Sequence, residues 1–426
     1  MEGILVKREK TKWYDLDNVA KIFPPSSNKK DPRVFRFTCE LTEEIDPSCL
    51  EKAAYEALRL FPYFRVVLKK GFFWYYLEST HLLPTVKEEK IPVCSPIYRK
   101  SSRKLLFRIS YYHKRINLEV YHALADGNGA LQYLETIVAY YLTYRYEEEY
   151  KNIPVELSYD ASTSEKTDDS FQKYYRKSKK NKPIKEKKSY QFTGEKIKTG
   201  RIKVVEGRMP VKEALNKAHT YKTTLTGYIT AVYIYAIGKN MKESEREKPI
   251  HIMVPVNLRT FFESASARNF FCMVPVRYTF KKKDTSFTDI VKSVTKSLQK
   301  ELQTKNIEAR MNEYVRLEKN FMARVVPLVL KNIVLKIAAA TESKNITSVV
   351  TNLGKVTMPE IYKKHIRLFD VFVSTSKMQI SMISYGDTLS ISFTSSFIEG
   401  EVIKDFYRFL AGEGIAITVA TNKVEG

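Results

Sequence analysis

The stretch RINLEVYHALADGNGALQYLETIVAYYLTYR, residues 115–145, constrains the fold of this 426-residue chain most. Every second residue from Ile116 to Val120 is apolar and His122 continues the same parity, so a strand here would project three apolar side chains and one imidazole from one face. The run DGNG, residues 126–129, then frees the backbone to turn. The apolar residues that follow recur at helical spacing: Leu131, Leu134, Ile137, Val138, Tyr141 and Leu142. The pattern predicts a strand, a turn and a helix, with His122 at the lip of the turn, where a side chain can reach a ligand.

A histidine in line with a buried apolar row is either a hydrogen-bonded core residue or a base that looks into a cavity. The glycine-rich turn after His122 favours the base. The other five histidines lack ligand spacing with one another or with a carboxylate cluster, so no metal site is predicted: His81, His113, His219, His251 and His365. The sequence has no GxxxxGK, HExxH or GxSxG motif, which removes the commoner NTPase, zinc-protease and α/β-hydrolase interpretations.

The rest of the chain predicts two halves that mix strands with helices. Before the basic segment, the expected elements are a strand at 33–41, a helix after an Asp46 cap, and two hairpins at 63–77 and 105–122. After it, the patterns predict helices at 211–218, 226–241, 286–303 and 401–411, strands at 251–259, 272–280 and 347–356, and a hairpin across 385–387. The 226–241 helix is expected to start from a Thr226 cap. Because strands and helices do not alternate regularly, we predict an α/β fold without an all-parallel sheet, whose two halves meet at a cleft.

A formal net charge of +24 raises the local concentration of anions, such as nucleic acid, anionic lipid or the phosphates of a cofactor. Much of the excess is local, because residues 173–203 hold 13 Lys or Arg against Glu186 and Glu195. We interpret this run as a solvated linker rather than a nucleic-acid arm. The predicted organisation is an N-terminal half at 1–165, a basic linker at 166–203 and a C-terminal half at 204–426.

Cysteine spacing and the apolar runs bear on the compartment. Four cysteines lie far apart without a CxxC pair, which fits a reducing cytosol better than a disulfide framework. The first 18 residues lack the apolar core of a signal peptide, so we expect a cytoplasmic protein. The most apolar later run, 321–340, carries charges and Pro327 and is interpreted as a kinked, mostly buried helix, not a membrane span.

The segment YHALADG, residues 121–127, resembles the HxxxDG signature of the chloramphenicol acetyltransferase-like superfamily. That superfamily includes alcohol acetyltransferases, peptide-synthetase condensation domains and plant acyltransferases that use acyl-CoA. Three further segments look similar: VPVNLRTFF with ARNFF at 254–271, VVTNLG at 349–354 and SYGDTLSISFTSSF at 384–397. Condensation domains usually carry a second histidine where this chain has Tyr121, and the DFGWG motif of the plant enzymes is missing. The closest likeness is therefore to alcohol acetyltransferases and their bacterial relatives.

The resemblance implies two chloramphenicol acetyltransferase-like halves, each a mixed, largely antiparallel sheet with helices, which meet at a central tunnel. It also implies acyl transfer from acyl-CoA to a small alcohol or amine, with neutral His122 as general base and without a metal or a covalent enzyme intermediate. An imidazole suits this task because its ordinary pKa of about 6.5 is close to working pH.

The resemblance assigns further roles to residues that match the motifs. Asp126 takes the structural role and pairs with Arg259, while Gly127 lets the backbone and the ligand come close. Asn352 is the candidate polar contact near the reacting carbonyl or acceptor, and Thr351 is the weaker one. Each has an alternative: Asp126 as a helix cap, Arg259 as a surface cation at a strand end, and Asn352 as a residue that a turn selects.

Three hypotheses follow. The first is an acyl-CoA-dependent O- or N-acyltransferase whose basic residues attract the phosphates of the cofactor. The second is a condensation-type transferase whose donor arrives on an acyl carrier protein. The third is a non-catalytic protein whose basic surface binds nucleic acid or an anionic membrane; nucleic acid is the partner we expect least.

Overall fold

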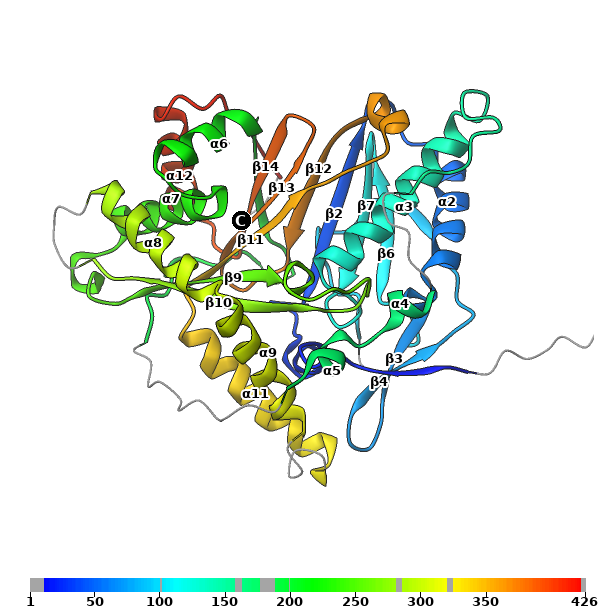
Figure 1. Cartoon of the computed structure of the whole chain (residues 1–426), viewed down its shortest axis with the longest axis horizontal. Coiled ribbons are helices and arrows are strands. Elements are labelled where there is room, and N and C mark those ends of the chain that lie inside the picture. The colour runs from blue at the N-terminus through cyan, green and yellow to red at the C-terminus, as the bar shows by residue number, and fades with distance from the viewer. Residues whose placement is uncertain are drawn as a thin grey trace, which may run out of the picture.

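The computed structural model describes residues 11–99, 102–157, 163–176, 188–198, 200–280, 286–319 and 325–422. Two large sheets form the two lobes of the molecule (Figure 1). The five-stranded sheet has the order β12-β2-β7-β6-β5 and consists of β2 (Val34–Leu41), β5 (Val86–Glu88), β6 (Phe107–Tyr112), β7 (Arg115–Tyr121) and β12 (Ile366–Val373). Its pairings are antiparallel except for β5 with β6.

The second sheet has seven strands in the order β10-β9-β11-β13-β14-β8-β15. They are β8 (Lys203–Pro210), β9 (Ile250–Asn257), β10 (Phe271–Tyr278), β11 (Ser348–Lys355), β13 (Met378–Tyr385), β14 (Thr388–Ser395) and β15 (Thr418–Thr421). Only β11 pairs in parallel, with β9 and with β13. A small sheet of β1 (Trp13–Asp15), β4 (Tyr75–Ser79) and β3 (Val66–Lys70) completes the described strands. The prediction of an α/β fold with mixed, largely antiparallel sheets is confirmed.

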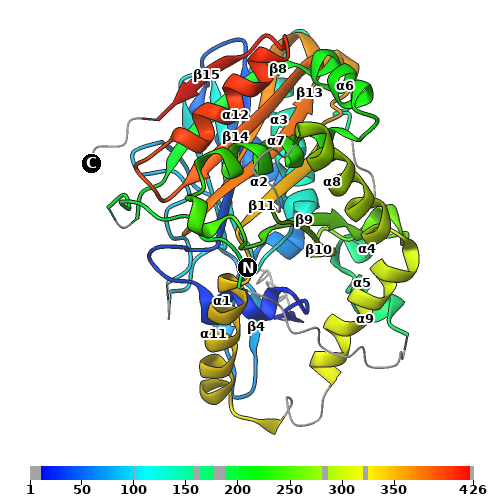
Figure 2. The same ribbon diagram turned by 90° about the vertical axis from the view of Figure 1, so that its left-hand side faces the viewer.

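Helices cover both large sheets. On the five-stranded sheet, α2 (Pro47–Leu60) packs beside α3 (Gly127–Arg145), and α2 begins where the Asp46 carboxylate accepts hydrogen bonds from the amides of Ser48 and Cys49. The other lobe carries α6 (Val211–Thr220), α7 (Leu225–Asn240), α8 (Phe287–Glu301) and α12 (Glu401–Gly412), which lie together over one face of its sheet (Figure 2). The remaining described helices are α1 (Phe23–Ser26), α4 (Thr163–Thr167), α5 (Ser170–Tyr174), α9 (Thr304–Lys319) and α11 (Leu328–Lys344).

The start of α7 differs from the expected Thr226 cap. The helix begins at Leu225, and the cap is Thr224, whose hydroxyl accepts a hydrogen bond from the amide of Gly227 at 3.1 Å. Either threonine suits a cap by residue type, and the position of the turn decides between them. The Thr226 hydroxyl therefore does not cap α7.

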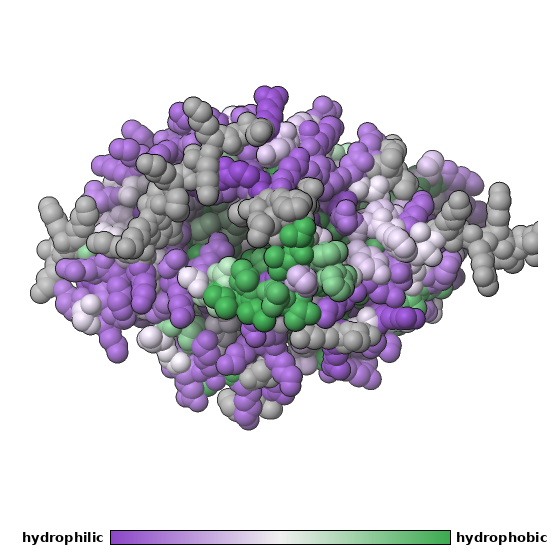
Figure 3. All heavy atoms as spheres, turned by 90° about the horizontal axis from the view of Figure 1, so that it is seen from below, coloured by the Kyte–Doolittle hydropathy of each residue, from purple (hydrophilic) through white to green (hydrophobic). Residues whose placement is uncertain are grey.

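The expectation of a mostly buried helix at 321–340 is wrong. Residues 320–324 lie outside the described residues, and α11 begins only after Pro327. Within α11 only Leu328 and Lys331 are buried, while a row of aliphatic side chains stays exposed. No described element covers that row, and Figure 3 shows the apolar residues gathered on the underside of the molecule. Among the described helices, none has the length and apolarity needed to cross a membrane.

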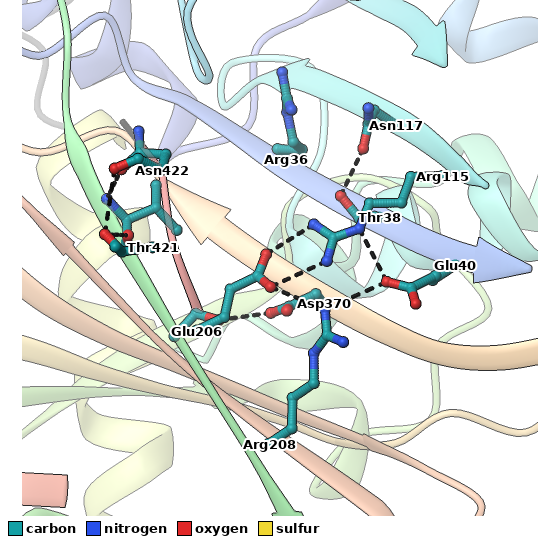
Figure 4. A network of polar contacts seen from close by, with 12 residues as sticks. Arg36, Thr38, Glu40, Arg115, Asn117, Glu206, Arg208, Asp370, Thr421 and Asn422 are labelled. Carbon is teal, nitrogen blue, oxygen red and sulfur yellow. Dashed lines mark hydrogen bonds and ion pairs between the residues drawn. The ribbon is translucent and has the colours of Figure 1, made fainter. Parts of the chain in front are cut away.

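Polar side chains join the two lobes. The Arg115 guanidinium from β7 donates to Glu206 on β8 at 2.9 Å and to Glu40 on β2 at 3.0 Å (Figure 4). Arg208 on β8 contacts Glu40 at 3.3 Å and Glu206 at 3.0 Å. In addition β12, which belongs to the later part of the chain, pairs with β2, so the five-stranded sheet is built from both parts. The domain boundaries at 165 and 203 stay a prediction.

Candidate active site

His122 lies directly after β7, in the turn that leads into α3. Its backbone amide donates to the carbonyl of Arg33 at 2.9 Å, and the amide of Leu124 returns to the carbonyl of Tyr121 at 2.9 Å, which makes the turn tight. The neighbours Tyr121 and Ala123 are fully buried, whereas His122 is partly exposed. Part of His122 therefore reaches solvent, although its ring Nδ1 is buried and has no hydrogen-bond partner among the described residues.

Aromatic rings surround the imidazole. Phe23 on α1 stacks on it with ring centroids 4.6 Å apart, Phe35 on β2 meets it edge-on at 4.9 Å, and Phe271 lies at 5.9 Å. Because this apolar setting disfavours the charged ring, burial lowers the pKa of His122 from 6.5 to about 4, and the charge of Asp126 offsets only part of the shift. The ring is neutral at physiological pH and can accept a proton.

Asp126 is both a helix cap and the partner of Arg259. It caps α3, because Oδ1 accepts from the amide of Gly129 at 2.9 Å. Its other oxygen, Oδ2, accepts from Nη1 of Arg259 at 2.8 Å and from the amide of Phe270 at 2.8 Å. The carboxylate thus fixes the first turn of α3 to the loop that follows β9.

Arg259 is not a surface cation, since only 9% of its side chain is exposed. Besides Asp126, its guanidinium donates to the carbonyls of Ser266 and Arg268, at 2.7 Å and 2.6 Å from Nη2. A planar guanidinium can hold several acceptors in a fixed geometry. Arg259 therefore shapes the loop 258–270 and ties it to the HxxxDG turn.

Two glycines let other parts of the chain approach the turn closely. A Cβ on Gly127 would lie 2.8 Å from the side chain of Leu353, in the TNLG segment at the end of β11. A Cβ on Gly129 would lie only 1.9 Å from the carbonyl oxygen of Ala267. Gly127 thus makes room for a neighbouring element of the protein; its role toward a ligand stays a prediction.

Asn352 and Thr351 lie on β11, next to this contact. The Asn352 side chain donates to the hydroxyl of Thr226 at 2.9 Å and accepts from the amide of Gly354 at 2.8 Å, so it is both a turn residue and a link to α7. Thr351 and Asn352 are partly exposed. Through Leu353 and Gly127 the end of β11 reaches the start of α3, which brings the candidate residues of both lobes to one region.

Sequence reasoning gave no role to several residues that hold the turn. Nδ2 of Asn269 donates to the carbonyl of His122 at 3.3 Å, and the amide of Asn269 donates to buried Asp17 at 3.0 Å. Arg268 pairs with Asp17 at 2.6 Å, although burial still raises the pKa of this carboxyl to about 6. Asn269 and Arg268 belong to the ARNFF segment, which was a usable signal, whereas nothing in the sequence pointed to Phe23.

The first residues of the predicted basic linker, 166–203, pack against the same loop. The carbonyls of Lys166 and Asp168 accept hydrogen bonds from Ala267 and Ser266, at 2.9 Å and 2.7 Å. Phe171 on α5 is fully buried against Phe270, with ring centroids 5.2 Å apart. Within the basic run, residues 177–187 and residue 199 lie outside the described residues.

A pocket of about 390 Å³ lies elsewhere, beside the small sheet. It is lined by Trp13, Tyr14, Asp15, Trp74, Tyr75 and Tyr76, and none of these was predicted as a site residue. The central tunnel that the resemblance implies stays a prediction.

A family model described as alcohol acetyltransferase matches residues 113–386, well over half of the chain. A search of curated protein sequences gives no match. Among solved structures, TRI3 trichothecene 15-O-acetyltransferase from Fusarium sporotrichioides has a TM-score of 0.62 at 12% identity, covering 95% of this chain and 95% of that chain.

Condensation domains have similar folds. The first condensation domain of the calcium-dependent antibiotic synthetase has a TM-score of 0.61 at 12% identity over 96% of this chain and 99% of that one. A variant of the starter condensation domain of rhizomide synthetase RzmA, in complex with C8-CoA and Leu-SNAC, has a TM-score of 0.58 at 9% identity. The match covers 94% of this chain and 93% of that chain. At these identities the likeness shows a shared two-lobed fold.

Proposed function

The chain belongs to the alcohol acetyltransferase family, and from that premise we propose that it moves an acyl group from acyl-CoA to a small alcohol or amine. The observation that carries the proposal is the position of His122, a partly exposed residue whose ring lies among aromatic side chains in a turn that both lobes hold. A base that is deprotonated at working pH and fixed by its surroundings is what removal of an acceptor proton requires.

In the proposed mechanism, His122 takes the proton of the acceptor hydroxyl or amine as its oxygen or nitrogen attacks the thioester carbonyl. The tetrahedral intermediate then collapses, the carbon–sulfur bond breaks, and the imidazolium returns the proton to the departing thiolate. No covalent bond to the protein and no metal are needed. Asn352, and less strongly Thr351, are proposed to contact the reacting carbonyl or the acceptor.

Asp126, Gly127 and Arg259 are proposed as positioning residues. Because the Asp126 carboxylate is saturated by Arg259 and two amides, it supports the turn rather than relaying a proton. Asn269 is proposed as a further positioning residue, because its side-chain Nδ2 donates a hydrogen bond to the backbone carbonyl of His122.

Coenzyme A as the donor is supported by the family match and by the RzmA neighbour, which was solved with C8-CoA. The charge of +24 favours an anionic donor. A donor on an acyl carrier protein is the alternative, which the condensation-domain neighbours favour. We propose a cytoplasmic location, for which the four free cysteines are suitable.

The test is release of free thiol from acetyl-CoA and longer acyl-CoA thioesters in the presence of a panel of alcohols and amines. We expect His122→Ala to retain the melting temperature and to lower kcat by at least about a hundredfold, the usual contribution of a positioned base. His113→Ala, at an exposed histidine, is the matched control and should retain full activity. A His122→Ala enzyme with the rate of the wild type would contradict the mechanism.

The same assay separates the donors. Turnover with free acyl-CoA supports coenzyme A, whereas turnover only with the acyl group loaded on a carrier protein supports the alternative. If no thioester is consumed and the chain is retained on heparin or DNA in a salt-dependent way, the non-catalytic hypothesis replaces both.

A further inference from the structure

An exposed apolar surface extends over α11 and the tip of the β3–β4 hairpin, and we call it the apolar face. Phe72 is 73% exposed at the hairpin tip and Val334 is 64% exposed on the helix. The members of the apolar face are Phe72, Phe73, Val325, Val329, Leu330, Ile333, Val334 and Ile337. Figure 3 shows apolar side chains together on this side of the molecule. Soluble monomers rarely expose so many large apolar side chains in one place.

The hairpin and the helix form one continuous surface. The amide of Leu328 donates to the carbonyl of Phe72 at 2.9 Å, and Nζ of Lys331 donates to the carbonyl of Phe73 at 3.0 Å. Lys331 also lies over the ring of Trp74 at 3.6 Å. These contacts bury the polar groups at the junction, so apolar side chains point outward on both sides of it.

The spacing along α11 explains why the face is so broad. Residues 329, 330, 333, 334 and 337 fall on one side of a helix with 3.6 residues per turn. Leu328 and Lys331 fall on the other side and are buried against the protein. The helix is thus amphipathic in an unusual sense, with its more apolar side toward solvent.

Lysines lie beside the apolar face. Helix α11 has one carboxylate, Glu342, which falls on the side of the helix opposite the apolar face. Lys336 and Lys344 on α11 are exposed, and Lys70 is exposed where β3 ends before the hairpin tip. An apolar helix face bordered by lysines is the pattern of a helix that lies in the interface of an anionic membrane.

We propose that the apolar face docks the protein onto the surface of an anionic lipid bilayer. The aliphatic and phenylalanine side chains would enter the acyl boundary, while the lysines meet the headgroups. A second copy of the chain fits less well, because two such faces would bring lysines of two molecules with a charge of +24 together. Docking does not depend on the proposed acyl transfer.

Docking would also place the candidate site near the bilayer. Helix α11 packs against α1 (Figure 2), and Phe23 on α1 stacks on the imidazole of His122. A membrane-dissolved acceptor or acyl donor would then have a short path to the base. This consequence, unlike the docking itself, rests on the proposed function.

The test is flotation of the full chain with vesicles of phosphatidylcholine containing about one third phosphatidylserine. We expect the wild type to float. Val334→Asp should lower the partition constant by about tenfold or more, because it removes an apolar side chain that would enter the bilayer and adds a negative charge that the anionic headgroups repel. Val419→Asp makes the same substitution at a 49% exposed valine on β15, at the opposite end of the molecule (Figure 2), and should float like the wild type. Equal melting temperatures show that both variants are folded.

Lys336→Glu tests the role of charge. It should weaken flotation with the mixed vesicles severalfold and leave the weak binding to pure phosphatidylcholine unchanged. The proposal is overturned if Val334→Asp floats like the wild type, or if the wild type does not float. It is equally overturned if Val334→Asp turns a dimer into a monomer on size exclusion, or abolishes a complex with an acyl carrier protein, while flotation is absent.

Discussion

At the scale of single residues, the environment of His122 determines its chemistry. Three aromatic rings keep the charged imidazole from being hydrated, so the proton affinity is lower than that of a free histidine. A less basic imidazole accepts a proton less strongly, but it is fully deprotonated across the physiological range. His122 is thus a weaker base than a free histidine, but a larger fraction of it is in the deprotonated form that can accept a proton.

The first prediction concerns the pH profile of kcat/KM. Because burial lowers the pKa of His122 to about 4, activity should stay level as the pH falls from 8 to 5 and decline only near pH 4. Phe23→Ser, which opens the cage to water, should move the acidic limb toward 6.5. A wild-type limb near 6.5 would contradict a dehydrated ring. Between pH 6.5 and pH 4 the imidazole of His122 binds a proton in the unfolded chain but not in the folded chain. The free energy of unfolding should therefore also fall as the pH is lowered from 6.5 to 4.

What the sequence could predict about the site depends on where each contact is made. His122 and Asp126 belong to one short motif, so their place at a strand end and a helix cap followed from local pattern. The Arg259 partner followed from family resemblance alone. Asn269 and Phe23 could not be assigned, because Asn269 reaches His122 across 147 positions and the Phe23 ring meets it only after folding.

At the scale of elements, the start of α3 is held by close backbone approach. Gly129 lies against the carbonyl of Ala267, and Gly127 lies against Leu353 of β11, so α3 is in contact with segments of the other lobe on two sides. The sequence indicated a turn from these glycines, and the resemblance implied a close approach of a ligand at Gly127, but neither indicated the contacts with Leu353 and Ala267. At α11 the sequence prediction was wrong, because the apolar composition of the segment was interpreted as burial although most of its side chains are exposed.

The second prediction tests the close approach at Gly129. Gly129→Ala should lower the free energy of unfolding by about 3 kcal/mol, because the new Cβ meets a backbone oxygen that cannot move aside cheaply. Gly412→Ala in α12 is the matched control, since nothing lies within 4 Å of its Cβ position, and it should change stability by less than about 1 kcal/mol. Urea unfolding measures both values. Equal effects of the two substitutions would show that the α3 contact is loose.

At the scale of the whole molecule, the two lobes share a partly buried set of charges. Glu206 and Arg208 come from the seven-stranded sheet, and Glu40 and Arg115 come from the five-stranded sheet. Asp370 on β12 lies in the same network, where its Oδ1 accepts from the hydroxyl of Ser392 on β14 at 2.6 Å. The candidate residues also come from both lobes, so the lobes meet at this junction and again at the HxxxDG turn.

The third prediction concerns Asp370, whose carboxyl is fully buried. Burial, together with the negative charge of Glu206, raises its pKa to about 7, whereas the unfolded carboxyl ionises near its ordinary value of 3.8. The folded chain therefore holds a proton that the unfolded chain loses, and this contribution to the free energy of unfolding should decline as the pH rises from about 4 to 8. Asp370→Asn keeps the shape of the side chain without the ionisation, so its stability should fall less than that of the wild type over this range.

Urea unfolding at pH 5 and pH 8 gives the comparison, with Asp387→Asn, at an exposed aspartate of the β13–β14 hairpin, as the control. An equal change in stability from pH 5 to pH 8 in the wild type and in Asp370→Asn would place an ionised carboxylate at the junction instead. An ionised Asp370 would add a third negative charge beside Glu206 and Glu40, and the arginines would then have to neutralise all three. The difference between the two proteins thus reports whether Asp370 holds a proton at the junction between the lobes.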